Sequence, residues 1–199
     1  MFQQAIVKEF FEEEQDIISK PKYRAEVQKV IDDHQLKYVL AQFVDIHGSA
    51  KTKSVPISGL KAIEGAGVGF AGFAISGMGM QPHGPDFMVK GDLSSLTPVP
   101  WQPGYGRVVC EGYVNGKPHP YDSRYVLRKQ VERLSAKGWT LNTGLEPEFS
   151  LFRRGEDGKL KAVDESDNLD KPCYDYKGLS RSRQFLERIT EALIPVGFD

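Results

Sequence analysis

Two glutamates lie two residues apart in the sequence GLEPEFSLF, which spans residues 144–152. Side chains alternate between the two faces of a β-strand, so this segment predicts a strand with Glu146 and Glu148 on one face. The other face would be a core face formed by Leu145, Pro147, Phe149 and Leu151. Because Cα atoms two residues apart on a strand are separated by roughly 6.5–7 Å, the two carboxylates could bind two neighbouring divalent cations or opposite sides of one.

These two carboxylates would supply only oxygen ligands, which suit Mg²⁺ or Mn²⁺ better than zinc. A half-exposed strand with a solvated acidic face is the alternative, because glutamate side chains are mostly exposed in folded proteins. A carboxylate-pair hydrolase is a further alternative, but such enzymes place their two acids about 5–10 Å apart on opposite sides of the substrate. The glutamates predicted here are instead adjacent on one strand face.

The composition is that of a globular chain. Its 199 residues are 40% hydrophobic and 27% charged, which suits one large domain or two small ones. The net charge of −1 gives no electrostatic reason to expect nucleic acid or an anionic membrane as a partner. The apolar runs are shorter than the roughly 18 residues of a membrane-spanning helix, and the N-terminus lacks the pattern of a signal peptide, so a cytoplasmic location is expected.

The two cysteines are Cys110 and Cys173. They are far apart in the sequence and form no C-x-x-C pair, which argues against a disulfide scaffold and against a thiolate zinc site. Both are expected to be buried free thiols.

The first half of the chain predicts a helix followed by short strands. Residues 21–34 have an apolar stripe at helical spacing, and residues 37–55 contain two runs rich in β-formers. A short helix is predicted around residues 57–63 and a strand at residues 107–113. Residues 67–72 match the glycine pattern of dinucleotide-binding loops, but a helix-like segment precedes them and no helix pattern follows, so the match is interpreted as chance.

The second half begins after a turn-rich stretch. Asp122 or Ser123 is expected to cap a helix that stops at Gly138. Residues 139–152 are predicted to be β structure that carries the two glutamates, and residues 180–193 are predicted to form a helix.

Several segments between residues 22 and 199 resemble the glutamine synthetase family. HPYDSRYVL is similar to the H-x-x-D-P-R-x-V-L that opens the family's catalytic domain, GLEPEFSLF is similar to its G-x-E-x-E-F-F-L-F strand, and CYDY is a weaker match to its Y-F-D. In the first half, FVDIHG resembles the F-x-D-x-x-G of its small β-grasp domain, and GPDFMVKGD resembles its E-S-D-M-x-L-x-P-D. These segments are residues 119–127, 144–152, 173–176, 43–48 and 84–92.

The resemblance implies an α+β fold. A small β-grasp-like N-terminal domain would be followed by a truncated α/β catalytic domain with an antiparallel sheet. The implied division places an N-terminal arm at residues 1–21, the β-grasp-like domain at residues 22–116 and the start of the catalytic domain at residues 117–199.

The resemblance also implies an ATP-dependent ligase, which joins ammonia or a small amine to the γ-carboxylate of glutamate through γ-glutamyl phosphate and uses Mg²⁺ or Mn²⁺. Glu146 and Glu148 match the family's two metal-binding carboxylates on this strand, one for each ion. Asp45 and Asp86 match positions that the small domain contributes to a neighbouring subunit's active site, where a carboxylate attracts ammonium and takes its proton. For both aspartates the alternative is a turn residue that bonds local backbone N–H groups. The implied assembly is a homo-oligomeric ring with active sites between subunits.

Two departures from the family pattern bear on function. The family's F-D-G-S-S segment is FAISG here, residues 73–77, without its acid, which suggests a divergent branch whose acceptor is methylamine or a polyamine. The sequence also ends before the region where the family supplies its other metal carboxylates and its glutamate-binding arginines, so the chain is expected to be an inactive N-terminal fragment. The alternative function is that of a noncatalytic β-grasp binding or assembly module related to the family.

Overall fold

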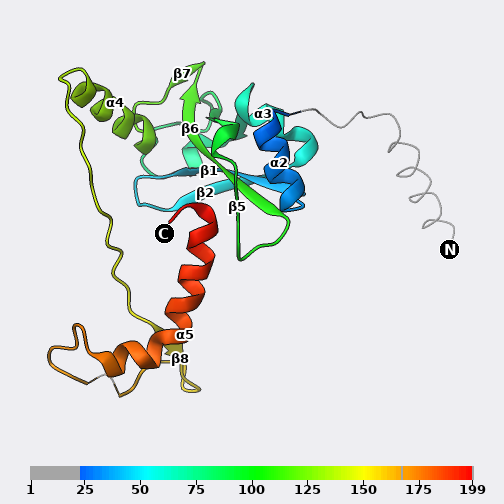
Figure 1. The fold of residues 1–199 in the computed structure, drawn as a ribbon. Coiled ribbons are helices and arrows are strands. Elements are labelled where there is room, and N and C mark those ends of the chain that lie inside the picture. Colours follow the sequence, from blue (N-terminus) through cyan, green and yellow to red (C-terminus); the bar gives the residue numbers. More distant parts are fainter. Residues whose placement is uncertain (1–22, 167, 199) are drawn as a thin grey trace. The chain divides into compact units, whose positions relative to one another are not determined.

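The computed structural model describes residues 23–166 and 168–198. The chain divides into two compact units, Met1–Gln130 and Val131–Asp199, and each unit is described by itself. Figure 1 shows a sheet with short helices in the first unit, and a long helix and a small hairpin in the second. The predicted N-terminal arm, residues 1–21, and the start of the helix predicted from Pro21 lie outside the described residues.

Short elements build the first unit. Its helices are α2 (Ala25–Asp33), α3 (Leu60–Glu64) and the first part of α4 (Ser123–Ser135), with 3₁₀ turns η1 (Ile57–Gly59), η2 (Gly72–Ala74) and η3 (Leu93–Ser95). Its strands are β1 (Tyr38–Val44), β2 (Ala50–Pro56), β3 (Val68–Phe70), β4 (Phe87–Gly91), β5 (Thr97–Pro98), β6 (Tyr105–Val114) and β7 (Lys117–Pro118). The described part of the predicted first helix, the two following strands, the short helix and the strand at residues 107–113 are therefore confirmed.

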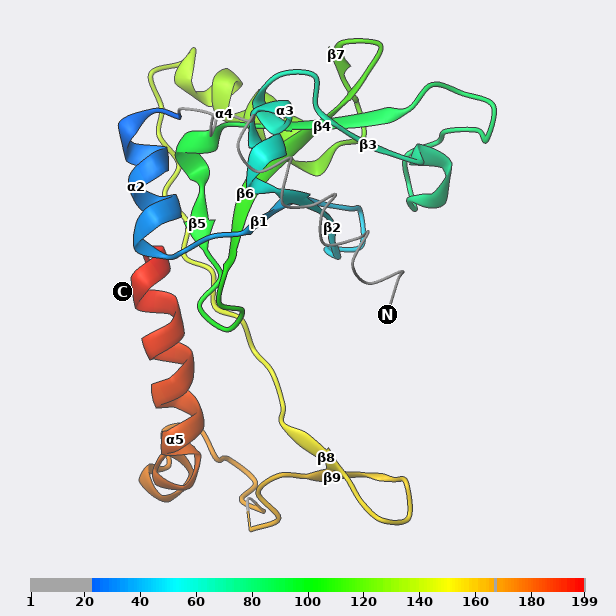
Figure 2. The same ribbon diagram turned by 90° about the vertical axis from the view of Figure 1, so that its right-hand side faces the viewer.

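The described strands of the first unit form one mixed sheet in the order β2-β1-β6-β4-β3, and β5 and β7 also pair with β6 (Figure 2). β1 runs parallel to β6, whereas β2 pairs antiparallel with β1, and β4 pairs antiparallel with both β6 and β3. Two parallel neighbours need a long crossover connection, which the segment from η1 to β5 supplies. The long strand β6 thus joins the two halves of the sheet.

The core of the first unit is formed by one side of this sheet together with α2 and α3. Alternate residues of β1 are buried, as the two-residue period of a strand requires. Val27 and Ile31 are four residues apart on α2 and share this core with Leu60 and Ile63 of α3. The spacing of apolar residues in the sequence therefore determines which side of each element faces inward.

Gly112 in β6 lies directly beneath the ring of Phe87 in β4. A Cβ atom at residue 112 would be 1.9 Å from Phe87 Cζ, which is far inside van der Waals contact, so only glycine leaves room for the ring. The centroid of the buried Phe87 ring is also 5.2 Å from that of Phe43 and 5.6 Å from that of His119. Gly112 therefore sets how closely this aromatic cluster packs on the sheet.

The two outer strands of the sheet, β2 and β3, are linked by the side chain of one residue, Lys53. Lys53 of β2 donates a hydrogen bond to the carbonyl of Gly69 in β3, and its Nζ lies 5.1 Å from the centroid of the Phe70 ring. The Phe70 ring in turn makes an edge contact with Phe43 of β1. The sheet is thus strongly curled.

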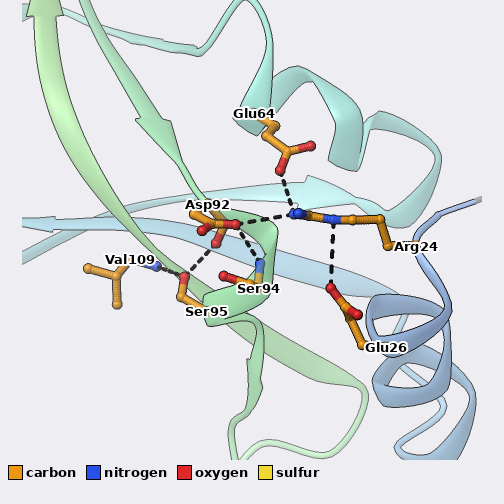
Figure 3. A network of polar contacts seen from close by, with 7 residues as sticks. All are labelled: Arg24, Glu26, Glu64, Asp92, Ser94, Ser95 and Val109. Atoms are coloured by element: carbon orange, nitrogen blue, oxygen red, sulfur yellow. Dashed lines mark hydrogen bonds and ion pairs between the residues drawn. The ribbon is translucent and has the colours of Figure 1, made fainter.

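Arg24, at the start of α2, connects three elements (Figure 3). Its Nη2 donates to Glu64 Oε1 on α3 at 2.7 Å and to Asp92 Oδ1 at 3.2 Å. Asp92 also caps η3 by accepting from the backbone N–H of Ser94 at 2.8 Å. The bonds from Ser94 and the nearby Arg24 hold the pKa of the Asp92 carboxyl below its usual value. This exposed network fastens α2 to α3 and η3.

The second unit contains the end of α4, a hairpin and a helix. Its further elements are β8 (Phe152–Arg154), β9 (Leu160–Ala162), α5 (Tyr176–Leu193) and η4 (Ile194–Val196). Asp175 caps α5, because its Oδ2 accepts from the N–H of Gly178 at 2.7 Å. The predicted helix at residues 180–193 is confirmed and begins one turn earlier. None of the described residues from 131 onward is buried, so this unit has no core of its own.

The β structure predicted over residues 139–152 is wrong except at its last residue, where β8 begins. Residues 140–150 make no backbone hydrogen bond within the described structure, whereas the carbonyl of Leu151 accepts one from Val163. The predicted core face is also wrong, because Leu145 is 90% exposed and Phe149 is 60% exposed. A strand needs a neighbour to satisfy its N–H and C=O groups, and the described residues place none beside this segment.

The cysteines differ in their environments. Cys110 in β6 is a buried free thiol, as expected, whereas Cys173 is exposed, so the prediction that both are buried is wrong for Cys173. Cys173 follows Pro172 in a loop of the second unit, where no core is available to cover it. Among the described residues, none of the helices combines the length and apolar character that crossing a bilayer requires.

Candidate active site

Asp45 lies in the loop that joins β1 to β2. It is 3% exposed, and its Oδ1 accepts hydrogen bonds from the backbone N–H groups of His47 at 2.9 Å and Ser49 at 3.0 Å. Its Oδ2 lies 3.2 Å from Lys51 Nζ. The side chain therefore closes an Asx-type turn and forms an ion pair with the first residues of β2.

The turn also determines the charge state of Asp45. Burial works to raise the pKa of the Asp45 carboxyl, but the hydrogen bonds from Ser49 and His47 and the Lys51 cation outweigh burial and hold the pKa below its usual value. A carboxylate with a lowered pKa and three partners is a poor proton acceptor. This geometry suits a role in holding the loop.

Asp86 is placed differently. It directly precedes β4 and is exposed. Among the described residues, no hydrogen bond or ion pair involves its carboxylate. Asp86 therefore does not bond local backbone N–H groups, as an aspartate in a turn would. Its side chain is free to interact with a ligand or with another chain.

Glu146 and Glu148 are both exposed and lie in the segment that forms no strand. Their oxygen donors have the right chemistry for Mg²⁺ or Mn²⁺. The number of donors is too small, because in residues 23–166 and 168–198 no three His, Cys, Asp or Glu side chains are grouped so that they could hold a metal ion. The residues described here thus fit the type of ion but do not complete its coordination.

Two acids of the second unit, Asp164 and Asp175, line an open groove of about 850 Å³. Both carboxylates already accept hydrogen bonds from nearby residues. Asp164 accepts hydrogen bonds from Ser166 and from Arg181, whose Nε is 2.6 Å from Oδ2, and these partners lower the pKa of the Asp164 carboxyl. Asp175 is the cap of α5. The groove otherwise has a largely apolar lining that includes Phe149, Leu151, Val163 and Phe185, and it adds no further carboxylate.

The start of α4 contains polar residues whose role the sequence showed only in part. Of the two predicted caps, Asp122 and Ser123, Asp122 is the one that acts, because its Oδ1 accepts from the N–H of Tyr125 at 2.8 Å. Its Oδ2 also accepts from the N–H of Gly112 in β6 at 3.1 Å, a contact that the sequence did not predict. Burial raises the pKa of the Asp122 carboxyl and lowers the pKa of the neighbouring His119 imidazole.

A second link to the same strand was missed entirely. Arg128 Nε donates to Glu111 Oε1 at 3.0 Å, and Arg128 Nη2 donates to Glu111 Oε2 at 2.9 Å. The two residues are 17 positions apart, so no helical or strand period brings them together. A charge count alone could not have found this pair.

Comparison with known proteins agrees with the sequence motifs. Residues 120–199 match the family model of the glutamine synthetase catalytic domain. The chain is 60% identical over 176 residues to the glutamate–methylamine ligase of Methyloversatilis universalis, covering 88% of this chain and 40% of that protein. It is 30% identical over 166 residues to the glutamine synthetase of Rhizobium leguminosarum, covering 83% of this chain and 37% of that protein.

The fold also has a counterpart among solved structures. The structure "GmaS/ADP complex-Conformation 1" gives a TM-score of 0.71 at 24% identity, covering 86% of this chain and 39% of that chain. This likeness shows a shared mixed α+β fold. The chain spans about two fifths of the length of the curated relatives it matches.

The family model and the curated relatives agree on one family for this chain. The chain belongs to the glutamine synthetase family.

Proposed function

We propose that the protein containing this chain is an ATP-dependent ligase that joins an amine to the γ-carboxylate of glutamate through γ-glutamyl phosphate. The observation that carries the proposal is the 60% identity to a glutamate–methylamine ligase, which is twice the 30% identity to a glutamine synthetase over a similar length. Methylamine is therefore the acceptor we favour over ammonia. The loss of the family's acid in residues 73–77 agrees with a change of acceptor.

In this proposal, Glu146 and Glu148 each hold a divalent cation, Mg²⁺ or Mn²⁺, together with donors from outside this chain. Bound cations of this kind neutralise the charge on the phosphoryl group that ATP transfers. Both carboxylates are exposed and available for this role. Asp86, which is exposed next to β4, is the better candidate for a residue that attracts the amine, and Asp45 supports the loop before β2.

The domain organisation belongs to the same proposal. Residues 22–116 would be a β-grasp-like domain, which is supported by the mixed sheet and by the packing of α2 and α3 against it. Residues 117–199 would begin the catalytic domain, in a cytoplasmic homo-oligomer with active sites between subunits. The comparisons favour this ligase over a noncatalytic binding module, because the high identity extends over 88% of the chain.

We further propose that the 199-residue chain has no ligase activity of its own. Among the described residues no third metal-ligating side chain stands near Glu146 and Glu148, so any Mg²⁺ bound there would be held mainly by water and would not be fixed in position. The unpaired segment around them would also leave the reacting groups in water.

The test uses a full-length protein that contains this sequence. ADP release is measured with glutamate, ATP and Mg²⁺ while the amine is varied among methylamine, ammonium and a polyamine. We expect the highest kcat/KM with methylamine, and loss of activity and of Mn²⁺ binding in Glu146→Ala and Glu148→Ala. Glu156→Ala, which alters an exposed glutamate in the β8–β9 turn, is the control and should behave like the parent. Absence of amine-dependent ADP release, or unchanged Mn²⁺ binding in both variants, would refute the proposal.

A further inference from the structure

Helix α4 is fastened to strand β6 at two points. The first is the Asp122 carboxylate, which bridges the N–H of Gly112 in β6 and the N–H of Tyr125 in the first turn of α4. The second is the Arg128–Glu111 pair, in which both guanidinium contacts are 3.0 Å or shorter. Glu111 and Gly112 are consecutive, so two neighbouring strand residues hold both ends of the first two turns of the helix.

Both attachments are stronger than ordinary surface contacts. The Asp122 side chain is 1% exposed, so losing it would leave the Gly112 N–H without its acceptor. The Glu111 side chain is only 17% exposed and the Arg128 side chain 41%, and a two-pronged arginine–carboxylate contact fixes direction as well as distance. The Arg128 guanidinium also lies 5.2 Å from the centroid of the Tyr125 ring. These contacts restrain how α4 can pivot on the sheet.

The attachments lie on one side of a boundary. The first compact unit ends at Gln130, inside α4, and the second begins at Val131. The fastened turns therefore belong to the first unit, while the last turn of the same helix belongs to the second. After Gly138, whose φ is +72°, the chain extends toward Glu146. The seven Cα-to-Cα steps from Trp139 to Glu146 span at most about 25 Å.

We propose that Glu111, Asp122 and Arg128 are positioning residues. They fix the first turns of α4 on β6 and thereby set the point at which the chain leaves the first unit, ahead of the segment with Glu146 and Glu148. The catalytic consequence rests on the proposed function, whereas the anchoring itself does not. Fixing the origin of the segment limits the space that the two carboxylates can sample, which favours their meeting the other metal donors.

The anchoring is tested by distance measurements on the 199-residue chain. Nitroxide labels are attached at Thr52→Cys on β2 and Lys129→Cys on α4, both exposed positions of the first unit, in a Cys173→Ser background. We expect a narrow distance distribution in the parent and one at least about twofold broader in Arg128→Ala and in Glu111→Ala. The charge exchange Glu111→Arg with Arg128→Glu should narrow the distribution again. Arg183→Ala, which removes a surface ion pair on α5, is the matched control.

The widths of the distance distributions decide whether the anchoring is real. Equal widths in all variants, or broadening that the charge exchange does not reverse, would overturn the proposal. If circular dichroism shows that Arg128→Ala is unfolded, Arg128→Lys replaces it, since lysine keeps the charge and loses the two-pronged geometry. The same criteria then apply to that variant.

A second measurement addresses catalysis in the full-length protein. Arg128→Ala should lower kcat about tenfold or more while leaving the KM for ATP within about twofold, and the charge exchange should restore kcat. An unchanged kcat would overturn the catalytic role. A parent without ligase activity would instead refute the proposed function, and the distance measurements would still decide the anchoring.

Discussion

The Asp45 carboxylate is a buried acceptor that the backbone of its own loop already uses. Oδ1 takes two N–H donors and Oδ2 pairs with Lys51. The residue matches a catalytic position in the family by resemblance, yet its surroundings are those of a structural turn. Asp86, the other candidate, has the opposite environment, because it is exposed and has no partner among the described residues.

Asp45 makes the stability of the first unit depend on pH. Its pKa is lower in the folded chain than its ordinary value, so its contribution is present above the ordinary aspartate pKa of about 3.9 and is lost as the pH falls through the folded pKa. Asp45→Asn cannot form an ion pair with Lys51, so its free energy of unfolding should be lower than that of the parent at pH 7. Urea denaturation at several pH values should show that the difference in free energy of unfolding between the two proteins shrinks below about pH 4. Asp86→Asn is the control, and a difference independent of pH would contradict the prediction.

The two thiols are expected to differ in reactivity. Burial raises the pKa of the Cys110 thiol to about 11, so roughly one molecule in a thousand carries the reactive thiolate at pH 8, and the side chain is 1% exposed. Cys173 is exposed. Treatment with iodoacetamide should modify one thiol per native chain and two per chain in guanidinium chloride, as counted by mass spectrometry. Cys173→Ser should abolish the native reaction, and labelling of Cys110 at a similar rate would refute this assignment.

At the scale of elements, residues 139–151 differ most from a regular structure. They are extended, exposed and without a partner strand in the described part of the chain. Amides of residues 140–150 should exchange with solvent at nearly unprotected rates in the 199-residue chain, and amides in the middle of β6 at least about a hundredfold more slowly. Hydrogen exchange followed by mass spectrometry measures both. Equal protection of the two segments would contradict the structure.

The comparison of β6 with this segment explains how far the sequence could predict the fold. Both were predicted to be β structure from local sequence alone, which does not state whether another strand lies alongside. β6 has neighbours on both sides, whereas the described residues place none beside residues 139–151. The local prediction was therefore correct for β6 and wrong for this segment.

The polar contacts also show that local sequence predicts only contacts between residues close together in the chain. The cap at Asp122 was predictable because it depends on residues close in sequence. Its bond to Gly112 and the Arg128–Glu111 pair depend on how β6 and α4 pack, which no local period encodes. Glu146 and Glu148 were found as candidates by their spacing, and the environment that would make them a metal site depends on groups distant from them in the chain.

At the scale of the whole molecule, the two units differ in how they are stabilised. The first has a buried core of residues from α2, α3 and the sheet, whereas the second has no buried residue among those described. Helices and hairpins gain most of their stability from packing an apolar face. The second unit should therefore be the less stable part of the isolated chain.

Limited proteolysis measures this difference. Trypsin should cleave first within residues 131–198 and leave a resistant fragment that contains residues 23–130, identified by mass spectrometry. Phe87→Ala, which removes a fully buried ring, should destabilise that fragment by about 3–5 kcal/mol and make it susceptible to trypsin. Early cleavage within residues 23–130 of the parent, with the second unit left intact, would show that the stabilities are reversed.

The side chain of Lys53 affects how molecules of this protein meet one another. An unpaired carbonyl on an outer strand is a place where a strand of another molecule can add, which is how edge-to-edge aggregation begins. The Lys53 ammonium donates a hydrogen bond to the Gly69 carbonyl on β3. An incoming strand would have to displace the ammonium group, which would then lose its acceptor. A residue that takes no part in the proposed chemistry thus covers one carbonyl of the outer strand β3, which makes strand addition at that point less favourable.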